Sequence, residues 1–331
     1  MTIDDGGVGL TENDVPGPHR DLIGYRSNVP QVCWPGGARV AINIVLNYEE
    51  GSEYSYPLGD GRNESLAESG RGMPSEYRDL RVESVYEYGS RAGVWRLMRL
   101  FDRYGIKVTF FATALALERN PDVCRGARES GHEIAAHGWR WTEPWLLDRR
   151  EEQRQIQLAI ESIERTCGER PRGWYSRYGP SVNTRELVVE AGGFRYDADA
   201  YNDDLPYFVN VHGAQHLVVP YTLIYNDIRY VLPEGFASPQ DFFETCKAGF
   251  NYLWEEGADN PRMMSIGLHP RWAGHPPRTA ALRDFIEYAL GKGDVWFARR
   301  LDIAEHWWTF HGASEQPGIA QNEKQTVDGE G

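Results

Sequence analysis

One stretch limits what this chain can fold into more than any other: the segment VAINIVLNYEEG at 40–51. Six of its first seven residues are apolar, with only Asn43 between them, and a glycine closes the segment. Such a run is typical of a strand that is buried on both faces in a parallel sheet. The run ends in Glu49 and Glu50. Carboxylates at the carboxyl end of a central strand lie where α/β folds collect functional residues, and a merely polar strand end is the alternative.

The composition indicates a folded protein and excludes several kinds of partner. Of the 331 residues, 41% are hydrophobic and 25% are charged, which is ordinary for a globular enzyme. A net charge of -14 without a basic cluster argues against nucleic acid and against anionic membranes as partners. The N-terminus has neither a basic region nor an apolar core, and no apolar run is long enough for a bilayer. We therefore expect a cytoplasmic protein.

The cysteines carry no recognisable pattern. Without a CxxC pair, neither a disulfide framework nor a thiolate zinc site is indicated, so we expect free thiols at Cys33, Cys124, Cys167 and Cys246.

The chain divides by composition into an arm, a main domain and a tail. Residues 1–35 are rich in Gly, Pro, Asp and Asn and predict an irregular N-terminal arm. The main domain spans 36–311 and includes a long insertion at 51–90, which has little apolar patterning. Residues 312–331 are polar and predict a disordered tail.

Strand and helix patterns alternate six or seven times along the main domain. We expect strands at 40–48, 107–114, 133–137 and 263–269, and helices at 94–104, 147–167, 184–191, 240–255 and 277–291. Two further strand-to-loop passages are expected at 172–184 and 194–208. Polar residues recur at the ends of the predicted strands: Glu49, Glu50, His137, Arg177, Asp197, Asp199 and His269. In a barrel of parallel strands these ends converge on one face, so the alternation predicts a single pocket built from distant residues.

Five motifs, in this order, carry a resemblance to a known family: NYEEG, HGWRW, WYSRYGPSVNT, YDADAYNDDLPYF and GLHPRWAGHP. Over about residues 38–310 the chain resembles the polysaccharide deacetylase family, also called the NodB homology domain. The resemblance implies an α/β fold with one deformed (β/α) barrel of about seven parallel strands.

The resemblance also implies where the family binds a metal, and this chain departs from that pattern. The first family motif is a pair of aspartates, a general base and then a metal ligand, and Glu49 and Glu50 stand there. The second supplies two histidines four residues apart, but here Trp141 follows His137. Catalytic zinc usually has three protein ligands, and an indole has no lone pair to give. We expect no resident metal, with zinc bound weakly by Glu50 and His137 as the alternative.

The motifs NYEEG, HGWRW and DDLPY together are similar to the PuuE-type allantoinase branch of this family. That branch implies metal-independent, ring-opening hydrolysis of a small cyclic amide, ureide or imide, and a homotetramer. One alternative is a metal-dependent N-deacetylase of an N-acetylated sugar or of peptidoglycan. A second alternative is a barrel that binds a ligand without catalysis. The third motif has Arg177 one residue away from its expected place, so a hydantoin or a bulkier amide is open beside allantoin.

The expected roles follow from amide hydrolysis, which needs a base, an oxyanion stabiliser and an acid for the leaving nitrogen. The base toward water is Glu49 or Glu50, or the two sharing one proton. The acid is His269, tuned by Asp197 or Asp199, and His137 polarises water or substrate. Residues expected to contact substrate are Trp141, Arg177, Asp197, Asp199 and Tyr201.

Overall fold

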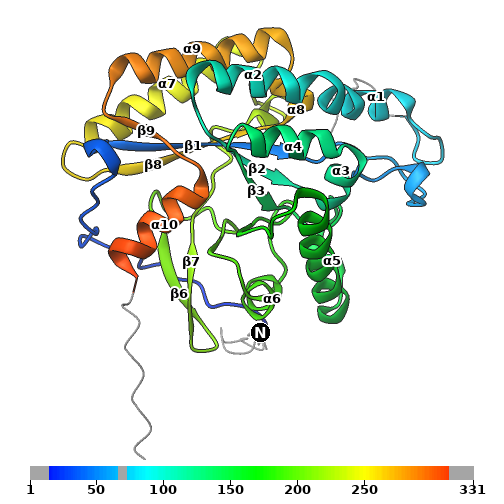
Figure 1. Cartoon of the computed structure of the whole chain (residues 1–331), viewed down its shortest axis with the longest axis horizontal. Helices are drawn as coiled ribbons and strands as arrows, with labels where there is room; N and C mark the ends of the chain where they lie inside the picture. Colours follow the sequence, from blue (N-terminus) through cyan, green and yellow to red (C-terminus); the bar gives the residue numbers. More distant parts are fainter. Residues whose placement is uncertain (1–14, 66–72, 313–331) are drawn as a thin grey trace, which may run out of the picture.

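The computed structural model describes residues 15–65 and 73–312, and its centre is a curled sheet (Figure 1). The nine strands of this described part run in the order β6-β7-β5-β4-β3-β2-β1-β8, with β9 beside β1. All pairs are parallel except β6 with β7. The strands are β1 (Val40–Tyr48), β2 (Thr109–Ala112), β3 (Glu133–Ala136), β4 (Gly173–Trp174), β5 (Tyr196–Asp197), β6 (Tyr207–Val211), β7 (Ala214–Val218), β8 (Arg262–Leu268) and β9 (Val295–Phe297). Seven successive parallel strands, from β7 to β8, confirm the predicted deformed (β/α) barrel.

Helices cover the outside of this sheet. In Figure 1, α2, α7 and α9 lie together on one side, and α5 lies across from them beside α3, α4 and α6. The helices are α1 (Leu80–Tyr88), α2 (Val94–Tyr104), α3 (Ala114–Arg119), α4 (Pro121–Glu129), α5 (Arg149–Cys167), α6 (Thr184–Ala191), α7 (Pro239–Glu256), α8 (Pro270–Ala273), α9 (Pro276–Lys292) and α10 (Arg300–His311). Shorter turns are η2 (Pro35–Gly37), η3 (Tyr56–Leu58), η4 (Gly89–Gly93), η5 (Pro144–Leu146) and η6 (Asp227–Tyr230). Within the described ranges no helix has the length and apolarity to cross a bilayer.

Strand β1 is buried along its whole length, as its apolar run predicts. Alternate residues point to opposite faces of a strand. Thus Ile42 and Ile44 join the apolar cluster under the helices, whereas Ala41 and Val45 join a second cluster inside the barrel. The polar exception, Asn43, faces inward as well.

The interior of the barrel holds a buried arginine from the far end of the chain. Arg300, the first residue of α10, donates to Asn43 Oδ1 at 2.8 Å and to Ser265 Oγ at 3.0 Å. Asn43 in turn donates to the carbonyl of Met264 at 3.1 Å. Arg300 also donates to the carbonyls of Val219 and Pro220. Buried polar groups need such partners, so Asn43 is one of the acceptors that hold α10 against this end of the barrel.

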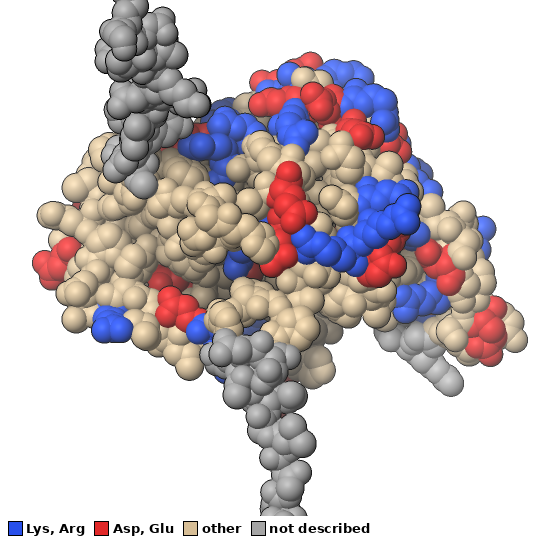
Figure 2. Space-filling view, turned by 90° about the horizontal axis from the view of Figure 1, so that it is seen from below, with Lys and Arg blue, Asp and Glu red and all other residues tan. Residues whose placement is uncertain are grey.

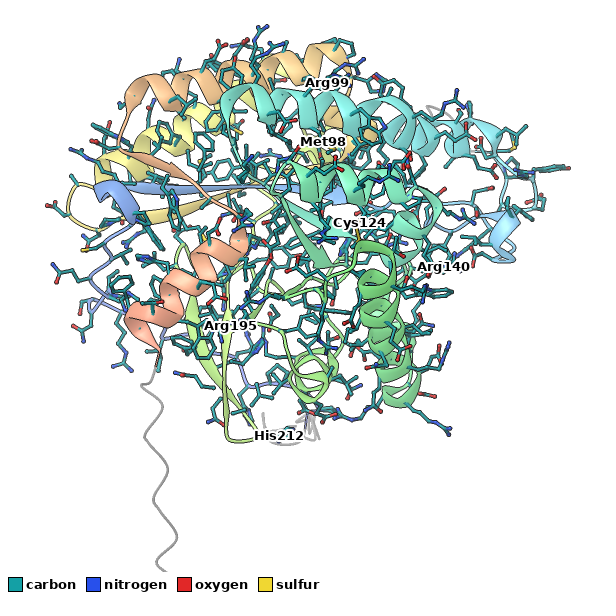
Figure 3. All side chains as sticks on the ribbon, in the orientation of Figure 1. Met98, Arg99, Cys124, Arg140, Arg195 and His212 are labelled. Atoms are coloured by element: carbon teal, nitrogen blue, oxygen red, sulfur yellow. A yellow bond between two sulfur atoms is a disulfide. The ribbon has the colours of Figure 1, made fainter. Side chains whose placement is uncertain are left out.

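Two of the cysteines are joined, which corrects the prediction of four free thiols. Cys124 in α4 and Cys167 at the end of α5 form a disulfide with their Cα atoms 5.7 Å apart (Figure 3). The two helices pack side by side, but 43 residues separate the cysteines in sequence, so no local motif reveals the pair. Cys33 and Cys246 are free.

The segments outside the barrel can be described only in part. In the arm, residues 15–34 form neither helix nor strand. The insertion at 51–90 contains η3 and also α1, which the weak apolar pattern does not predict. The predicted tail lies outside the described residues apart from Gly312. On the face in Figure 2, basic side chains lie beside acidic ones, with wide uncharged areas between them.

Candidate active site

The two glutamates leave the end of β1 in different directions. Successive strand residues alternate in direction, so Glu49 turns toward the barrel axis and Glu50 toward the helices. Gly51, at φ +92°, and a hydrogen bond from Ser52 N to the Glu49 carbonyl at 3.0 Å turn the chain away. Both carboxyls are enclosed, with Glu49 1% and Glu50 3% exposed.

Glu49 lies between two imidazoles that come from other strands. Its Oε1 is 3.3 Å from Nε2 of His137, which directly follows β3, and 3.6 Å from Nε2 of His269, which directly follows β8. Its Oε2 is 2.8 Å from Nη2 of Arg271. The structure therefore brings together three of the four residues predicted to be catalytic, and it adds an arginine that the motifs did not single out.

Hydrogen bonds on the far side of each imidazole orient it. His137 Nδ1 lies 2.8 Å from the carbonyl oxygen of Tyr175, which can only accept, so Nδ1 carries a hydrogen. His269 Nδ1 lies 2.6 Å from Oδ1 of Asp227. In both rings the other nitrogen, Nε2, faces Glu49.

The partner of His269 corrects the prediction that Asp197 or Asp199 tunes it. Asp227, at the start of η6, also accepts from the backbone of His269 at 2.8 Å and of Ala273 at 3.1 Å. The loop between β7 and α7 brings Asp227 to the end of β8, where an isolated bridge pairs Asn226 with Gly267. This loop reaches β8 without forming a strand of its own. No strand pattern in the sequence therefore indicated that Asp227 pairs with His269.

Asp197 has other partners. Its Oδ2 accepts from Arg185 Nε at 2.8 Å and lies 2.9 Å from His216 Nε2. Burial raises the pKa of Asp197, but Arg185 and His216 outweigh it and hold this pKa well below its usual range. Asp197 is thus part of a buried ion-pair network rather than of the Glu49 centre.

Asp199 holds the loop that orients His137. Its two carboxyl oxygens accept from the backbone N–H and from the hydroxyl of Ser176, each at 2.8 Å. Tyr175, whose carbonyl binds His137, immediately precedes Ser176. Asp199 therefore acts on the site through the backbone, which gives it a positioning role beside the predicted contact with substrate.

The two glutamates differ in charge at neutral pH. Burial raises the pKa of Glu49, but Arg271, His269 and His137 oppose it and lower this pKa to about 2. Burial also raises the pKa of Glu50, Arg271 only partly opposes this, and the charge on Glu49 adds to it, giving about 8. The proton of the pair therefore resides on Glu50, and Glu49 is the carboxylate.

Arg271 is enclosed by three aromatic rings. Its guanidinium carbon lies 4.3 Å from the ring centre of Trp272, 4.5 Å from that of Tyr86 and 5.2 Å from that of Trp141. The residue is fully buried, at 0% exposure. Arg271 stands in the GLHPRWAGHP motif two residues after His269, and that position, on the short helix α8 behind a predicted strand end, was the signal for it.

Trp141 lies between two arginines. Arg177 covers its ring at 3.8 Å, and Arg271 approaches at 5.2 Å. The Arg177 guanidinium also donates to Glu64 of the insertion at 2.8 Å and to the Trp141 carbonyl. Arg177 therefore ties the insertion to the wall of the site, and its predicted contact with substrate stays a prediction.

Tyr201 lies nearer the surface. It is 43% exposed, and its hydroxyl lies 2.7 Å from that of Tyr175. Tyr175 stacks on His137, with ring centres 5.0 Å apart. Tyr201 thus lies on the outer side of the rings that cover His137, and its predicted contact with substrate stays a prediction.

The residues present do not fit the metal that the family pattern implies. Trp141 occupies the position of the second histidine and offers no ligand atom. Arg271 places Nη2 2.8 Å from Glu49 and Nη1 3.7 Å from Glu50, so a fixed cation already lies against both carboxyls. The second histidine of the family pattern is therefore missing, and the side of the carboxyls that a metal would share with Arg271 already holds a cation.

The turn η4 brings backbone against the site from outside. It is a π-type turn, a form that is frequent at functional sites. A Cβ atom on Gly89 would lie 2.3 Å from Oε1 of Glu50, and one on Gly93 would lie 2.1 Å from the Pro270 carbonyl. At Gly93 the neighbour is backbone, so only glycine permits the approach, whereas at Gly89 a larger residue would have to displace the Glu50 side chain.

Comparisons with known proteins agree with this geometry. The family profile described as polysaccharide deacetylase matches residues 77–196. A protein of Schizosaccharomyces pombe named "Putative polysaccharide deacetylase" is 37% identical over 314 residues, which cover 88% of this chain and 98% of that protein.

Two solved structures match nearly the whole chain. One, described as "Puue Allantoinase", is 49% identical, has a TM-score of 0.86, and the match covers 89% of this chain and 99% of that one. Another, the "probable Polysaccharide deacetylase" of Pseudomonas aeruginosa PAO1, is 47% identical with a TM-score of 0.85 and the same coverage. The chain therefore belongs to the polysaccharide deacetylase family.

Proposed function

We propose that this protein is a hydrolase of carbon–nitrogen bonds other than peptide bonds, and that it opens the ring of a small cyclic amide, ureide or imide. One observation carries the proposal: the Glu49 carboxylate lies between the Nε2 atoms of His137 and His269, at 3.3 and 3.6 Å. A carboxylate and two imidazoles at one point supply the base and the acids that amide hydrolysis needs. The likeness to the allantoinase structure, at 49% identity, supports the choice of a ring.

Glu49 acts as the base. It is ionised at neutral pH, whereas Glu50 keeps its proton. A water molecule beside Glu49 Oε1 gives a proton to this oxygen as its own oxygen bonds to the ring carbonyl carbon. The product of this step is a tetrahedral intermediate with a negative oxygen.

His269 acts as the acid. Its Nε2 gives a proton to the ring nitrogen as the carbon–nitrogen bond breaks, which releases an open-chain carboxylic acid with a free N–H group. Asp227, 2.6 Å from Nδ1, stabilises the protonated imidazole before transfer and fixes its orientation. The proton that Glu49 took from water then returns to His269 through solvent, which restores the site.

His137 donates to the developing oxyanion through Nε2, because Tyr175 holds Nδ1. Base and acid act in succession: Glu49 accepts its proton as the water attacks, and His269 gives its proton as the carbon–nitrogen bond breaks.

The donor set also bears on the substrate. Arg271 is bound by Glu49 and shielded by aromatic rings, so it does not polarise the substrate carbonyl. With His137 as the donor to the carbonyl oxygen and no cation there among the described residues, further activation must come from the substrate itself. Ring strain or a second electron-withdrawing carbonyl supplies it, as in hydantoins and imides, whereas a plain acetamide has neither.

A turnover screen tests the proposal. The purified protein is assayed on allantoin, hydantoins, succinimide-type imides, N-acetylated sugars and peptidoglycan fragments, with and without chelator. The Glu49→Gln variant is run in parallel, and the exposed Glu287→Gln serves as a matched control. We expect turnover of a ring substrate that survives chelation, is lost in Glu49→Gln and is kept in Glu287→Gln.

Two outcomes contradict the proposal. Turnover confined to N-acetylated substrates, lost with chelator and restored by zinc, identifies a deacetylase. Binding of a ring compound without turnover, unchanged in Glu49→Gln, identifies a binding barrel.

A further inference from the structure

We propose that Arg271 is the built-in cation of this site: it occupies the space beside the two glutamates that a divalent metal needs, and so keeps the site metal-free. The kinetic part of its test rests on the proposed function, but the metal-binding part needs no turnover. Failure of the one can therefore be told from failure of the other.

The position of the guanidinium is the first observation. Nη2 lies 2.8 Å from Glu49 Oε2, and Nη1 lies 3.7 Å from Glu50 Oε1, so one side chain spans both carboxyls. Arg271 and Glu49 are 0% and 1% exposed. A second cation placed against the same oxygens would meet the repulsion of a buried positive charge that cannot lose its proton.

The second observation is how Arg271 is held. None of its three guanidinium nitrogens has an aligned hydrogen-bond acceptor among the described residues, and Glu49 Oε2 and Glu50 Oε1 have no aligned donor. Charge attraction and the rings of Tyr86, Trp141 and Trp272 hold it instead. The Arg271 guanidinium is therefore held mainly by its charge. It does not form the pair of parallel hydrogen bonds that is usual between arginine and a carboxylate.

The third observation explains the tryptophan. Trp141 follows His137 by four residues and is 3% exposed, with its ring facing Arg271 at 5.2 Å. An imidazole in its place would cover less of the guanidinium and would add a second ring nitrogen beside His137. Trp141 and Arg271 thus act together, since the ring that removes a metal ligand also seats the cation that replaces the metal.

Zinc binding by four proteins tests this: a parent protein that is wild type at the site, Trp141→His, Arg271→Met, and the double variant Trp141→His/Arg271→Met. All carry His212→Ala, because Glu186, Glu190 and His212 form an exposed group that could bind zinc. Zinc chloride is titrated calorimetrically into chelator-treated protein, and bound zinc is measured after desalting. We expect one equivalent in the double variant, at least about 10-fold tighter than in Trp141→His alone, a difference of about 1.4 kcal/mol.

The single Trp141→His variant decides between two explanations. If the missing histidine alone keeps metal out, this variant binds one zinc as tightly as the double variant, and the role of Arg271 is overturned. Tight binding of one zinc by the wild-type protein, abolished by His137→Ala, overturns it as well. If proteins with Arg271→Met do not fold, retention of one equivalent of zinc by Trp141→His after desalting overturns the role of Arg271 in the same way, and the wild-type result is unaffected.

The kinetic part compares Arg271→Met with Arg271→Lys on the ring substrate. Lysine keeps the charge and methionine keeps only the bulk. We expect kcat to fall at least about 100-fold in Arg271→Met and to stay within about 10-fold of wild type in Arg271→Lys, with KM little changed in both, since positioning the base affects the transition state. Equal losses in the two variants contradict a role for the charge.

Discussion

Two pairs of acidic residues lie at the ends of strands in this barrel, and each pair is buried beside an arginine. Glu49 and Glu50 follow β1, and Asp197 and Asp199 lie at the end of β5. Burial raises the pKa of all four, and an arginine lowers that of the first in each pair again. The second keeps a raised pKa, about 8 for Glu50 and about 7 for Asp199.

The pairs differ in how their polar atoms are satisfied. Arg185 makes aligned hydrogen bonds to both oxygens of Asp197, at 2.8 and 3.1 Å, and Ser176 satisfies both oxygens of Asp199. At the other pair, Arg271 and one oxygen of each glutamate lack aligned partners. Buried polar atoms without partners cost free energy, so their retention supports the proposed reactive role of the glutamate pair, whereas the satisfied aspartate pair fits the role of a structural brace.

The largest expected effect separates the two pairs directly. Glu49→Gln should lower kcat by about 1000-fold or more, since it removes the base. Its stability should change little, because Glu50 can ionise and take over the partner role toward Arg271. Steady-state kinetics and thermal unfolding check this, and kcat within about 10-fold of wild type would refute Glu49 as the base.

Asp227→Asn probes the acid side of the reactive pair. An amide at this position can hold the wrong tautomer of His269 and cannot stabilise its protonated form. We expect kcat to fall by about 100-fold or more with KM nearly constant. The matched control is Asp241→Asn at the start of α7, which should leave kcat unchanged; equal losses in the two variants would remove Asp227 from the mechanism.

Asp197→Asn should affect stability rather than chemistry. It leaves Arg185 and His216 without their carboxylate, and breaking a buried ion pair costs about 3 kcal/mol or more. Denaturant unfolding measures the loss, and kcat of the folded fraction should stay within about 10-fold of wild type. If Asp197→Asn lowers kcat as much as Glu49→Gln does, the aspartate pair is not merely structural and the two pairs do not differ in role.

The pH dependence of stability sharpens the comparison at Glu50. Its pKa is raised to about 8 in the folded protein, so the native state binds one more proton than the unfolded chain between the ordinary glutamate pKa and pH 8. The stabilisation is complete at low pH and is lost as the pH rises toward 8. In Glu50→Gln this dependence should vanish, so the difference in unfolding free energy between the variant and the wild type should change by roughly 4 kcal/mol across this pH range. Urea unfolding from pH 5 to 8.5 measures it, and parallel curves would contradict the raised pKa.

The smallest effect is expected at the outer wall. Tyr201→Phe removes the hydroxyl that contacts Tyr175, worth about 1 kcal/mol, so KM should rise no more than about 5-fold while kcat holds. The exposed Tyr252→Phe is the control. A kcat loss of about 100-fold would instead place the Tyr201 hydroxyl in the chemistry.

Elements with strong local signals could be predicted from the chain alone. The β1 run, the α2 periodicity closed by Gly105, and α5 between its Asp148 cap and Gly168 all appear as expected. Their signals lie within a few residues of one another. Strands β4 and β5 are two residues long and the β6–β7 hairpin is only half buried, so pairing with neighbours defines them rather than pattern. The arginine that begins α10 is explained only by its contacts across the barrel.

The site divides in the same way. Glu49, His137 and His269 could be found because each directly ends a strand, and parallel strand ends meet. Asp227 and Arg271 lie beyond strand ends, on η6 and α8, and their roles depend on which side chains they meet after the barrel curls. The sequence shows which residues directly follow a strand. It does not show which side chains a loop residue will contact in the folded protein.

The glycines of η4 have a consequence for how this protein can change over evolutionary time. Gly89 and Gly93 leave no room for even a methyl group against Glu50 and Pro270. A substitution at Gly93 would have to move the Pro270 backbone, and one at Gly89 would have to displace the buried Glu50 side chain, so stepwise sequence change is disfavoured at both positions. The aromatic and polar residues at the rim face no such barrier. We therefore expect differences in ring specificity to arise among the exposed residues around the site, while the glycine turn η4 stays unchanged.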